Sequence, residues 1–133
     1  MKLTLDTKTI QSINLFQNIT GCSVVDYIEN ESDIYLVVAQ GQYGLAVGKG
    51  GEKVKHAERV FKKNIRVFEY SDDLEQFIMN AVPETKEIEK KNGKIFIKIS
   101  AGDRSKVIGK DGRNIKVISR FLKHLFDIGC KVK

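Results

Sequence analysis

Residues 47–55 read VGKGGEKVK, and residues 108–116 read IGKDGRNIK. Each stretch has an apolar residue, then Gly-Lys-x-Gly, then a basic segment with a second apolar residue three positions after the last glycine. The two stretches lie 61 residues apart, and the same offset aligns residues 34–67 with residues 95–128 without a gap. Eight of these 34 positions are identical. The pattern therefore indicates a tandem duplication.

The length and composition of the chain fit two small folded domains. Its 133 residues contain 41% hydrophobic and 30% charged residues, which argues against a disordered protein. No Gly-, Ser- or Pro-rich linker separates the copies, because Tyr70 leads directly into Ser71. We expect one domain at residues 1–70 and a second at residues 71–133, packed as one rigid unit because each is small for a stable core.

Hydrophobic periodicity predicts the same α-β-β-α-α-β order in both copies, which is an α+β fold. In the first copy, the six elements are expected between Asp6 and Gly21 and at residues 22–29, 34–39, 41–47, 52–63 and 65–70. In the second copy, they are expected between a cap at Ser71 or Asp72 and Pro83, and at residues 84–90, 94–100, 103–108, 113–126 and 128–132. The pair Asn92-Gly93 predicts a hairpin turn.

Apolar spacing also predicts which side chains of the helices after the glycine stretches face the core. They are Val54, Ala57, Val60, Phe61, Ile115, Ile118, Leu122 and Leu125. Asn64 is expected to cap the first of these helices. Ile128, Cys130 and Val132 alternate as a closing strand would, although Gly129 could instead cap a longer preceding helix.

The glycine stretches have the composition of anion-binding loops. Glycine permits positive φ and a close approach of the backbone to a ligand. The helix that follows directs free N–H groups toward the loop, and these groups favour an anion there. Lys49 and Lys110 add positive charge at equivalent positions. A plain helix–turn–helix would explain one such loop, but two in register with the same lysine favour ligand binding.

The positive charge of the chain is concentrated on the same segments. Residues 49–66 carry a net charge of +5 and residues 104–123 carry +6, whereas the rest of the chain carries −5. A solvent-exposed helix face would explain one row of basic residues. It would not explain why positive charge is concentrated on the same segment in both copies. The net charge of +6 and the pI of about 9.3 favour a polyanionic partner.

The sequence contains no arrangement typical of catalysis or of a cofactor site. Residues 44–50 are one residue short of a P-loop and lack the Ser or Thr that would follow Lys49. Paired carboxylates, nucleophile–base pairs and metal-ligand spacings are also missing. Cys22 and Cys130 are expected to be small buried apolar residues. We therefore expect a protein that is not an enzyme, with no cofactor, no metal and no small-molecule substrate.

Membrane and export classes are not favoured. No apolar stretch approaches the roughly 20 residues needed to span a bilayer. The N-terminal sequence MKLTLDTKTIQS lacks the apolar core of a signal peptide. We expect a cytoplasmic protein without a membrane partner.

The sequences VGKGGEKVK and VIGKDGRNIK resemble the signature of KH domains, which bind single-stranded RNA or DNA. The element order resembles the prokaryotic (type II) version of that domain. Two such domains without a linker resemble the tandem KH pair of the NusA transcription factors. The short chain, with nothing before or after the pair, resembles the archaeal members of that family.

The resemblance implies that the two loops clamp a nucleic-acid backbone, beside an apolar groove for bases with a basic border. Val47, Val54, Ile108 and Ile115 would form the floor of the groove, or serve only as core residues. The implied RNA-binding residues are Val47, Gly48, Lys49, Gly50, Gly51, Lys53, Val54, Lys55, Ile108, Gly109, Lys110, Asp111, Gly112, Arg113, Ile115 and Lys116. Asp111 replaces the Gly50 of the first loop, and its negative charge is expected to weaken the second site.

The expected function is RNA binding in transcription elongation or termination, with nascent single-stranded RNA as the partner and RNA polymerase as a candidate protein partner. The resemblance to bacterial NusA does not extend to its polymerase-binding N-terminal domain. Contact with the polymerase would therefore need another surface, or the protein would act through the RNA alone. The alternatives are an rRNA-binding or ribosome-assembly KH protein, and a protein-interaction module whose KH folds have lost RNA contact.

Overall fold

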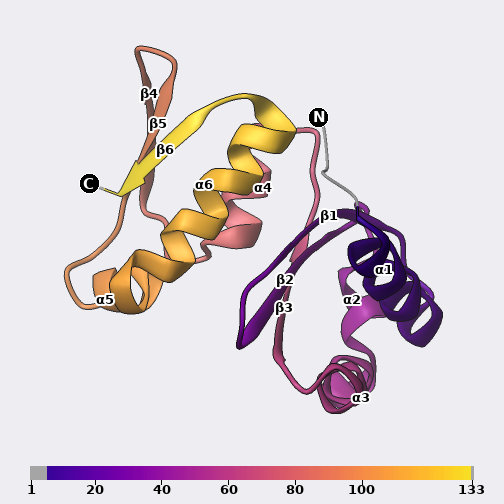
Figure 1. Cartoon of the computed structure of the whole chain (residues 1–133). Coiled ribbons are helices and arrows are strands. Elements are labelled where there is room, and N and C mark those ends of the chain that lie inside the picture. The colour runs from indigo at the N-terminus through magenta and orange to yellow at the C-terminus, as the bar shows by residue number, and fades with distance from the viewer. Residues whose placement is uncertain (1–5, 133) are drawn as a thin grey trace. The chain divides into compact units, whose positions relative to one another are not determined.

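The computed structural model describes residues 6–132 and has the α+β architecture predicted from the sequence (Figure 1). The chain divides between Ser71 and Asp72 into two compact units. We call the unit that contains residues 6–71 the first unit, and the unit that contains residues 72–132 the second unit. None of the helices in the described part of the chain is long and apolar enough to cross a membrane.

The first unit places α-helices against a mixed sheet. Its elements are α1 (Thr7–Thr20), β1 (Val24–Glu29), β2 (Asp33–Val38), α2 (Tyr43–Val47), the short 3-10 helix η1 (Lys49–Gly51), α3 (Glu52–Phe61) and β3 (Asn64–Glu69). The strand order is β1-β2-β3, with β1 antiparallel and β3 parallel to β2. Asp6 begins α1 by accepting a hydrogen bond from the Thr9 N–H at 2.7 Å, and Gly21 ends it at φ +78°, as predicted.

The core of the first unit lies between its sheet and its helices. Ile34, Leu36 and Val38 alternate along β2, and they pack with Phe16 of α1 and Ala57 of α3. Each of these five side chains is 1% exposed or less. This packing fixes α3, and with it the glycine loop before α3, against the sheet.

The second unit repeats the order of elements. They are α4 (Leu74–Ala81), β4 (Glu87–Lys91), β5 (Lys94–Lys98), α5 (Arg104–Ile108), the 3-10 helix η2 (Lys110–Gly112), α6 (Arg113–Phe126) and β6 (Gly129–Val132). The strand order is β4-β5-β6, with β4 antiparallel and β6 parallel to β5. The rings of Phe77 on α4 and Phe126 on α6 lie 5.5 Å apart between centroids, so these two helices are in contact.

The predicted inward faces of α3 and α6 are partly confirmed. Ile118 and Leu122 are buried as expected, whereas Val60 is 44% exposed, so its predicted core position is wrong. Val60 lies to one side of the helix face that buries Ala57, and α3 ends at Phe61, one residue after Val60. The sequence prediction also omitted Val117 and Phe121, which are buried because α6 packs a wider face than one apolar stripe. The remaining predicted positions, Val54, Phe61, Ile115 and Leu125, are half-buried.

The two copies differ in the length of the helix after the loop. Helix α3 has 10 residues and α6 has 14, so α6 continues for about one further turn. The caps Lys62 and Asp127 both adopt the left-handed conformation, at φ 58° and 54°. The predicted gapless alignment is therefore wrong beyond the first ten helical residues. The structural counterpart of Ile65 on β3 is Cys130 on β6, because both follow their helix cap by three positions and both pair with the central strand.

Several predicted ends of elements also need correction. Asn64 does not cap α3 but begins β3, and the cap is Lys62. Helix α4 is capped neither by Ser71 nor by Asp72 but by Asp73, which accepts from the Glu75 N–H at 3.2 Å. The predicted hairpin turn at Asn92-Gly93 is confirmed, with φ values of 53° and 74°. Gly129 belongs to β6, which settles the alternative in favour of a closing strand.

Candidate nucleic-acid interface

The two glycine loops have nearly the same backbone conformation. Gly48 and Gly109 have φ/ψ values of 79°/171° and 78°/172°, a region that only glycine adopts readily. A methyl group at Gly48 would lie 2.7 Å from Cγ of Lys53, and one at Gly109 would lie 2.9 Å from Cγ of Asn114. Both positions therefore require glycine, and the sequence repeat corresponds to a repeated three-dimensional shape.

The third position of each loop does not require glycine to the same degree. Gly50 has φ/ψ of 63°/18°, and Asp111 occupies the matching place at 57°/27°. Nothing lies within 4 Å of a methyl group built on Gly50. Asp is one of the few residues other than glycine that enter the left-handed region at modest cost. The loops therefore differ in charge but not in shape.

Each loop ends on a residue that leaves the following helix without a side-chain cap. Gly51 precedes α3 and Gly112 precedes α6, and neither helix receives a capping hydrogen bond from a side chain at this position. The Glu52 and Arg113 N–H groups donate instead to the Lys49 and Lys110 carbonyls within the loops. The helix dipole favours an anion at each of these helix starts. Lys49 and Lys110 are exposed beside these helix starts.

Residues at matching positions behind the two loops hold the loops in place. The ammonium of Lys53 donates to the Thr20 carbonyl at 3.2 Å, which ties α3 to the end of α1. The amide of Asn114 donates to the Lys106 carbonyl at 3.2 Å, which ties α6 to α5. The structure thus gives the Lys53 ammonium a partner within the protein, and its predicted contact with RNA stays a prediction.

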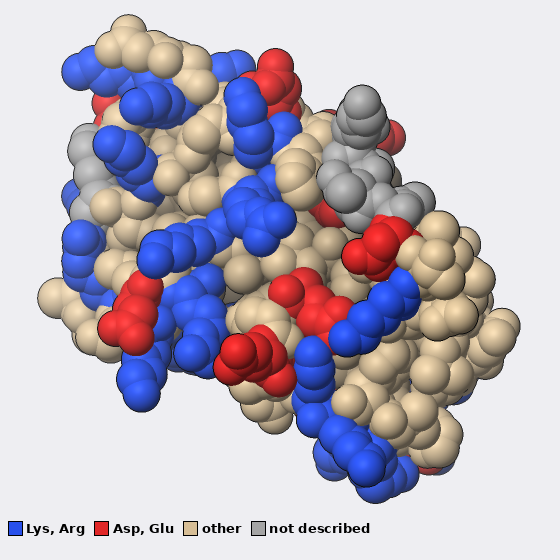
Figure 2. Space-filling view, viewed as in Figure 1, with Lys and Arg blue, Asp and Glu red and all other residues tan. Residues whose placement is uncertain are grey.

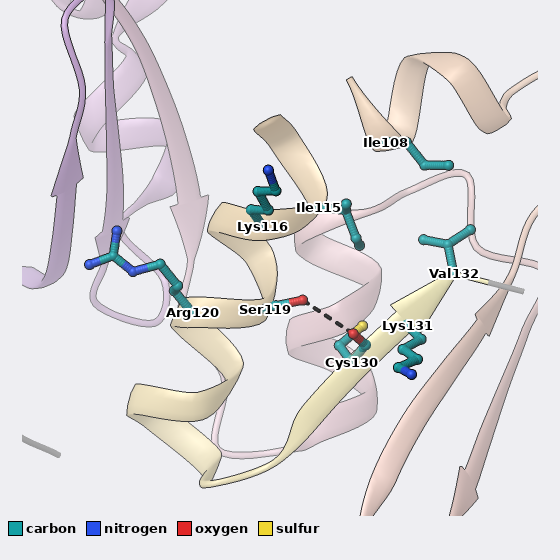
Figure 3. A pocket seen from close by; sticks show the side chains of 8 residues that line it. All are labelled: Ile108, Ile115, Lys116, Ser119, Arg120, Cys130, Lys131 and Val132. Atoms are coloured by element: carbon teal, nitrogen blue, oxygen red, sulfur yellow. Dashed lines mark hydrogen bonds between the residues drawn. The ribbon is translucent and has the colours of Figure 1, made fainter. Parts of the chain in front are cut away.

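The second unit has a largely apolar groove beside its loop, with a volume of about 560 Å³ (Figure 3). Figure 3 shows Ile108, Ile115 and Val132 around one space between α6 and β6. The residues that line the groove are Ile108, Ile115, Lys116, Ser119, Arg120, Cys130, Lys131 and Val132. Of the residues predicted from the sequence, the structure brings Ile108, Ile115 and Lys116 together here.

The sequence prediction missed the wall that β6 contributes to this groove. Cys130 and Val132 come from β6, and the Ser119 hydroxyl donates to the Cys130 carbonyl at 3.2 Å. The alternation of Ile128, Cys130 and Val132 was the available signal, but it did not identify which helix would face this strand. Cys130 is half-buried and not fully buried as predicted, whereas Cys22 is buried, and both thiols are free.

Burial also changes the acidity of the thiol in the groove. It raises the pKa of Cys130 to about 11, because the thiolate would lose solvation among apolar side chains. The Cys130 thiol therefore stays uncharged at neutral pH. Within residues 6–132, no cluster of three or more His, Cys, Asp or Glu side chains has the arrangement of a metal site.

The first unit offers a different surface beside its helix. Val47 and Val54, the predicted floor residues, are half-buried. A hollow of about 690 Å³ lies against α3, but its lining includes neither of them. The hollow is lined by Glu31, Ser32, Lys55, Glu58, Arg59, Lys62, Lys63 and Asn64. Lys55, Glu58 and Arg59 are the counterparts of Lys116, Ser119 and Arg120, so the two hollows share one side of the repeated helix.

The remaining predicted residues lie at or near the protein surface. Those that are exposed are Lys49, Gly50, Lys55, Lys110, Asp111, Arg113 and Lys116, and Gly48, Gly51, Gly109 and Gly112 are half-buried. In Figure 2, Lys and Arg side chains gather over the region where Figure 1 draws α5 and α6, and again over α3. The surface over α1 is mostly uncharged in the same view, as expected from a helix with one charged residue, Lys8.

Curated proteins similar to this chain are archaeal and are named "Probable transcription termination protein NusA". The protein of Methanococcus vannielii is 40% identical over 121 residues, which cover 86% of this chain and 70% of that protein. The protein of Methanocaldococcus jannaschii is 36% identical over 128 residues, covering 92% and 70% respectively. The protein of Halococcus morrhuae is 29% identical over 133 residues, covering 96% of both.

A solved structure is also similar over nearly the whole chain. The crystal structure of APE1850 is 31% identical in sequence and superposes with a TM-score of 0.76, covering 97% of this chain and 100% of that one. The α+β elements seen here are consistent with a KH-like fold. No protein-family model matches the chain.

Proposed function

Because the chain belongs to the family of archaeal NusA transcription termination proteins, we propose that it binds single-stranded RNA of nascent transcripts in elongation or termination. The protein acts as a binding protein and not as an enzyme. The two units are tandem type II KH domains, at residues 1–70 and 71–133, and each loop holds a stretch of RNA backbone. RNA polymerase is the proposed protein partner.

The observation that carries this proposal is the repetition of one loop shape with a lysine at its tip. Gly48 and Gly109 agree within 1° in both φ and ψ, although they lie 61 positions apart in the sequence. The positive end of a helix dipole, without a side-chain cap, and a lysine beside it form a favourable place for a phosphate group. Two such sites in one chain fit a repeating polyanion better than a single small anion.

The groove of the second unit supports a single-stranded ligand. Its walls are apolar side chains from α5, α6 and β6, with Lys116 and Arg120 also in its lining. Unpaired bases present flat apolar faces to such walls while phosphates meet the basic residues, which a duplex with stacked bases does not allow. About four nucleotides per loop give about eight for the pair. The direct junction at Tyr70 and Ser71 favours a rigid pair, which would raise avidity.

The test replaces both loops by Gly-Asp-Asp-Gly in the full chain. The changes are Lys49→Asp with Gly50→Asp in the first loop, and Lys110→Asp in the second. Asp111 already adopts the required conformation, so the fold should survive, as circular dichroism would verify. We expect affinity for a 12-nucleotide RNA to fall by at least about a hundredfold, because two lysines become aspartates and a third carboxylate is added beside the phosphates. Wild-type affinity should decrease with salt, with a slope near −0.7 per phosphate.

A matched control places the same kind of charge change away from the loops. Lys90 and Lys91 on β4 are exposed, and the Lys90→Asp, Lys91→Asp protein should bind RNA nearly as well as the wild type. Equal losses in the control and the loop variant would mean that net charge alone drives binding. Crosslinking in cells then identifies the RNA, and ribosomal RNA in place of nascent transcripts would support a role in ribosome assembly instead.

A further inference from the structure

The hollow beside α3 in the first unit is a second basic site that the glycine loop does not include. It lies toward the C-terminal end of α3, where the turn between β1 and β2 forms its opposite wall. Four cationic side chains line it: Lys55, Arg59, Lys62 and Lys63. The hollow also contains two carboxylates, so the partners of each charge decide what it can bind.

Two of the charged side chains in the hollow, Lys63 and Glu58, make contacts that stabilise the fold. Lys63 donates to the Glu29 carboxylate at 2.5 Å and to the Asn30 carbonyl at 2.9 Å, so its ammonium joins β1 to the end of α3. The Glu58 carboxylate accepts from the Ile65 N–H at 3.0 Å, at the edge of β3. Within residues 6–132, Lys55, Arg59 and Lys62 make no ion pair. Three cations therefore line the hollow without a fixed counterion.

These three cations continue from the loop along one side of the helix. Lys55, Arg59 and Lys62 are spaced four and three residues apart, which places them in one row about 10 Å long. The Lys55 side chain lies back over the loop, because a methyl group on Gly51 would be 3.7 Å from its Cε. The row thus connects the glycine loop with the hollow, and the blue surface over α3 in Figure 2 agrees with it.

At the C-terminal end of α6, the matching place in the second unit, a carboxylate neutralises the charge of a lysine. There the cap is Asp127, whose carboxylate pairs with Lys123 at 2.7 Å. The hydrogen bond and charge of Lys123 hold the pKa of Asp127 below its ordinary value, so the carboxylate stays ionised. In the first unit the cap is Lys62, a residue that gains nothing from the left-handed conformation. The helix dipole explains one cation at this end, but not a row that starts in the first turn.

From this arrangement we propose that the hollow binds a phosphate of the RNA strand held by the first loop, as a second backbone contact about two helical turns away. The inference rests on the proposed function, because the same strand must occupy the loop. Arg59 and Lys62 meet the phosphate oxygens, and Lys55 lies between this contact and the loop. The polar walls provide no apolar surface for a base. The first unit therefore contacts a longer stretch of RNA than its loop alone would hold.

The test uses Lys62→Asn in the full chain. Asn adopts the left-handed conformation more readily than Lys, so this variant removes the charge without strain. We expect its affinity for a 12-nucleotide RNA to be about threefold to tenfold weaker, and its salt slope to be smaller by about 0.7. Affinity for a tetranucleotide, which fills only a loop, should not change. Arg59→Gln should give the same pattern, because Arg59 lines the same hollow.

The second unit provides the matched control. Lys123→Gln removes a lysine that is already paired with Asp127, so RNA affinity should stay within about twofold. Equal effects of Lys62→Asn and Lys123→Gln, or an equal loss with the tetranucleotide, would overturn the proposal.

Two further measurements complete the test. One distinguishes free phosphate from the phosphates of RNA, and the other distinguishes failure of this inference from failure of the proposed function. Titration of inorganic phosphate, followed through the Lys62 amide resonance, tests binding of the free ion. If free phosphate binds there but Lys62→Asn leaves the 12-nucleotide affinity unchanged, the hollow is not part of the RNA path. If the wild-type protein binds no RNA, the proposed function itself fails, and this inference fails with it.

Discussion

The two units share one loop but differ in what lies beside it. In the second unit, the helix after the loop faces a groove walled by Ile108, Ile115 and Val132. In the first unit, the hollow along the equivalent helix is polar and basic. Duplication preserved the positions that shape the backbone, whereas the side chains along the helix diverged. We infer that the units contribute differently to binding of the proposed RNA. The second unit would contact its bases, and the first unit would contact its phosphates.

The difference traces to few substitutions at matching positions. Ser119 of the second unit corresponds to Glu58, and both side chains bond the backbone of the adjacent strand. The serine adds no charge to its groove, whereas the glutamate places a carboxylate beside the strand. Asp127 and Lys62 also differ in charge at the helix ends, but in the opposite sense, because the first unit has the positive residue there. A few charges therefore change the chemistry of a surface without changing its fold.

The largest expected effect tests whether the shared loop shape requires glycine in both units. Gly48→Ala and Gly109→Ala should each lower the free energy of unfolding by about 3 kcal/mol, because the added methyl meets a neighbouring residue at 2.7 and 2.9 Å and φ is positive. Gly50→Ala, with nothing within 4 Å, should cost only about 1 kcal/mol. Urea unfolding measures all three. Unequal costs at Gly48 and Gly109 would show that the two loops are not equivalent in stability.

A thiol provides a probe of the second groove that the first unit lacks, because Ile65 stands at the place of Cys130. With the pKa of Cys130 at about 11 and the ordinary value at 9.0, its thiolate fraction at pH 8 is about a hundredfold lower than that of a free thiol. Alkylation by iodoacetamide should be slower by a similar factor than in urea. The rate should rise with pH until about 11.

Bound RNA should slow this alkylation further if it occupies the groove. Mass spectrometry of peptides separates Cys130 from Cys22, whose pKa is also raised by burial. If saturating RNA leaves the Cys130 rate unchanged, the groove of the second unit does not hold the bases.

Exchanging the residues at the matched helix position should exchange the character of the two surfaces. Ser119→Glu places a carboxylate in the apolar groove and should weaken RNA binding about tenfold, through repulsion of phosphates and loss of apolar contact. Glu58→Ser should strengthen binding about threefold, and removal of the Ile65 N–H partner should cost about 1 kcal/mol of stability. Titrations by fluorescence anisotropy measure the affinities. Weaker binding by Glu58→Ser would mean that this carboxylate accepts a hydrogen bond from a base.

The smallest expected effect comes from exchanging the third residue of the loops. Gly50→Asp should weaken RNA binding about threefold and Asp111→Gly should strengthen it by a similar factor, because one negative charge is added or removed beside a phosphate. The conformations of Gly50 and Asp111 agree within 10°, so neither change should disturb the loop. Changes of the same sign in both variants would contradict a purely electrostatic role.

Local chemistry made most of the fold predictable from the sequence. The periodicity of apolar residues placed α6 at its observed bounds, and Asp6 and Gly21 delimited α1 through caps that depend on a few adjacent residues. Cap positions failed where neighbours compete, as at Asp72 and Asp73 before α4. The exposure of Val60 also could not be read from its spacing, because it depends on where α3 ends against the sheet.

What the sequence by itself determined is the repeated loop, since the need for positive φ at its glycines and the charge of its lysine are properties of the local chain. Only the tertiary structure decided what faces that loop. The pairing of β6 with β5 brings Cys130 and Val132 beside α6, and the extra turn of α6 sets their register. The row of cations Lys55, Arg59 and Lys62 borders a hollow only because the β1–β2 turn forms the opposite wall. Such surfaces depend on contacts between residues far apart in the chain, and spacing along the sequence does not encode them directly.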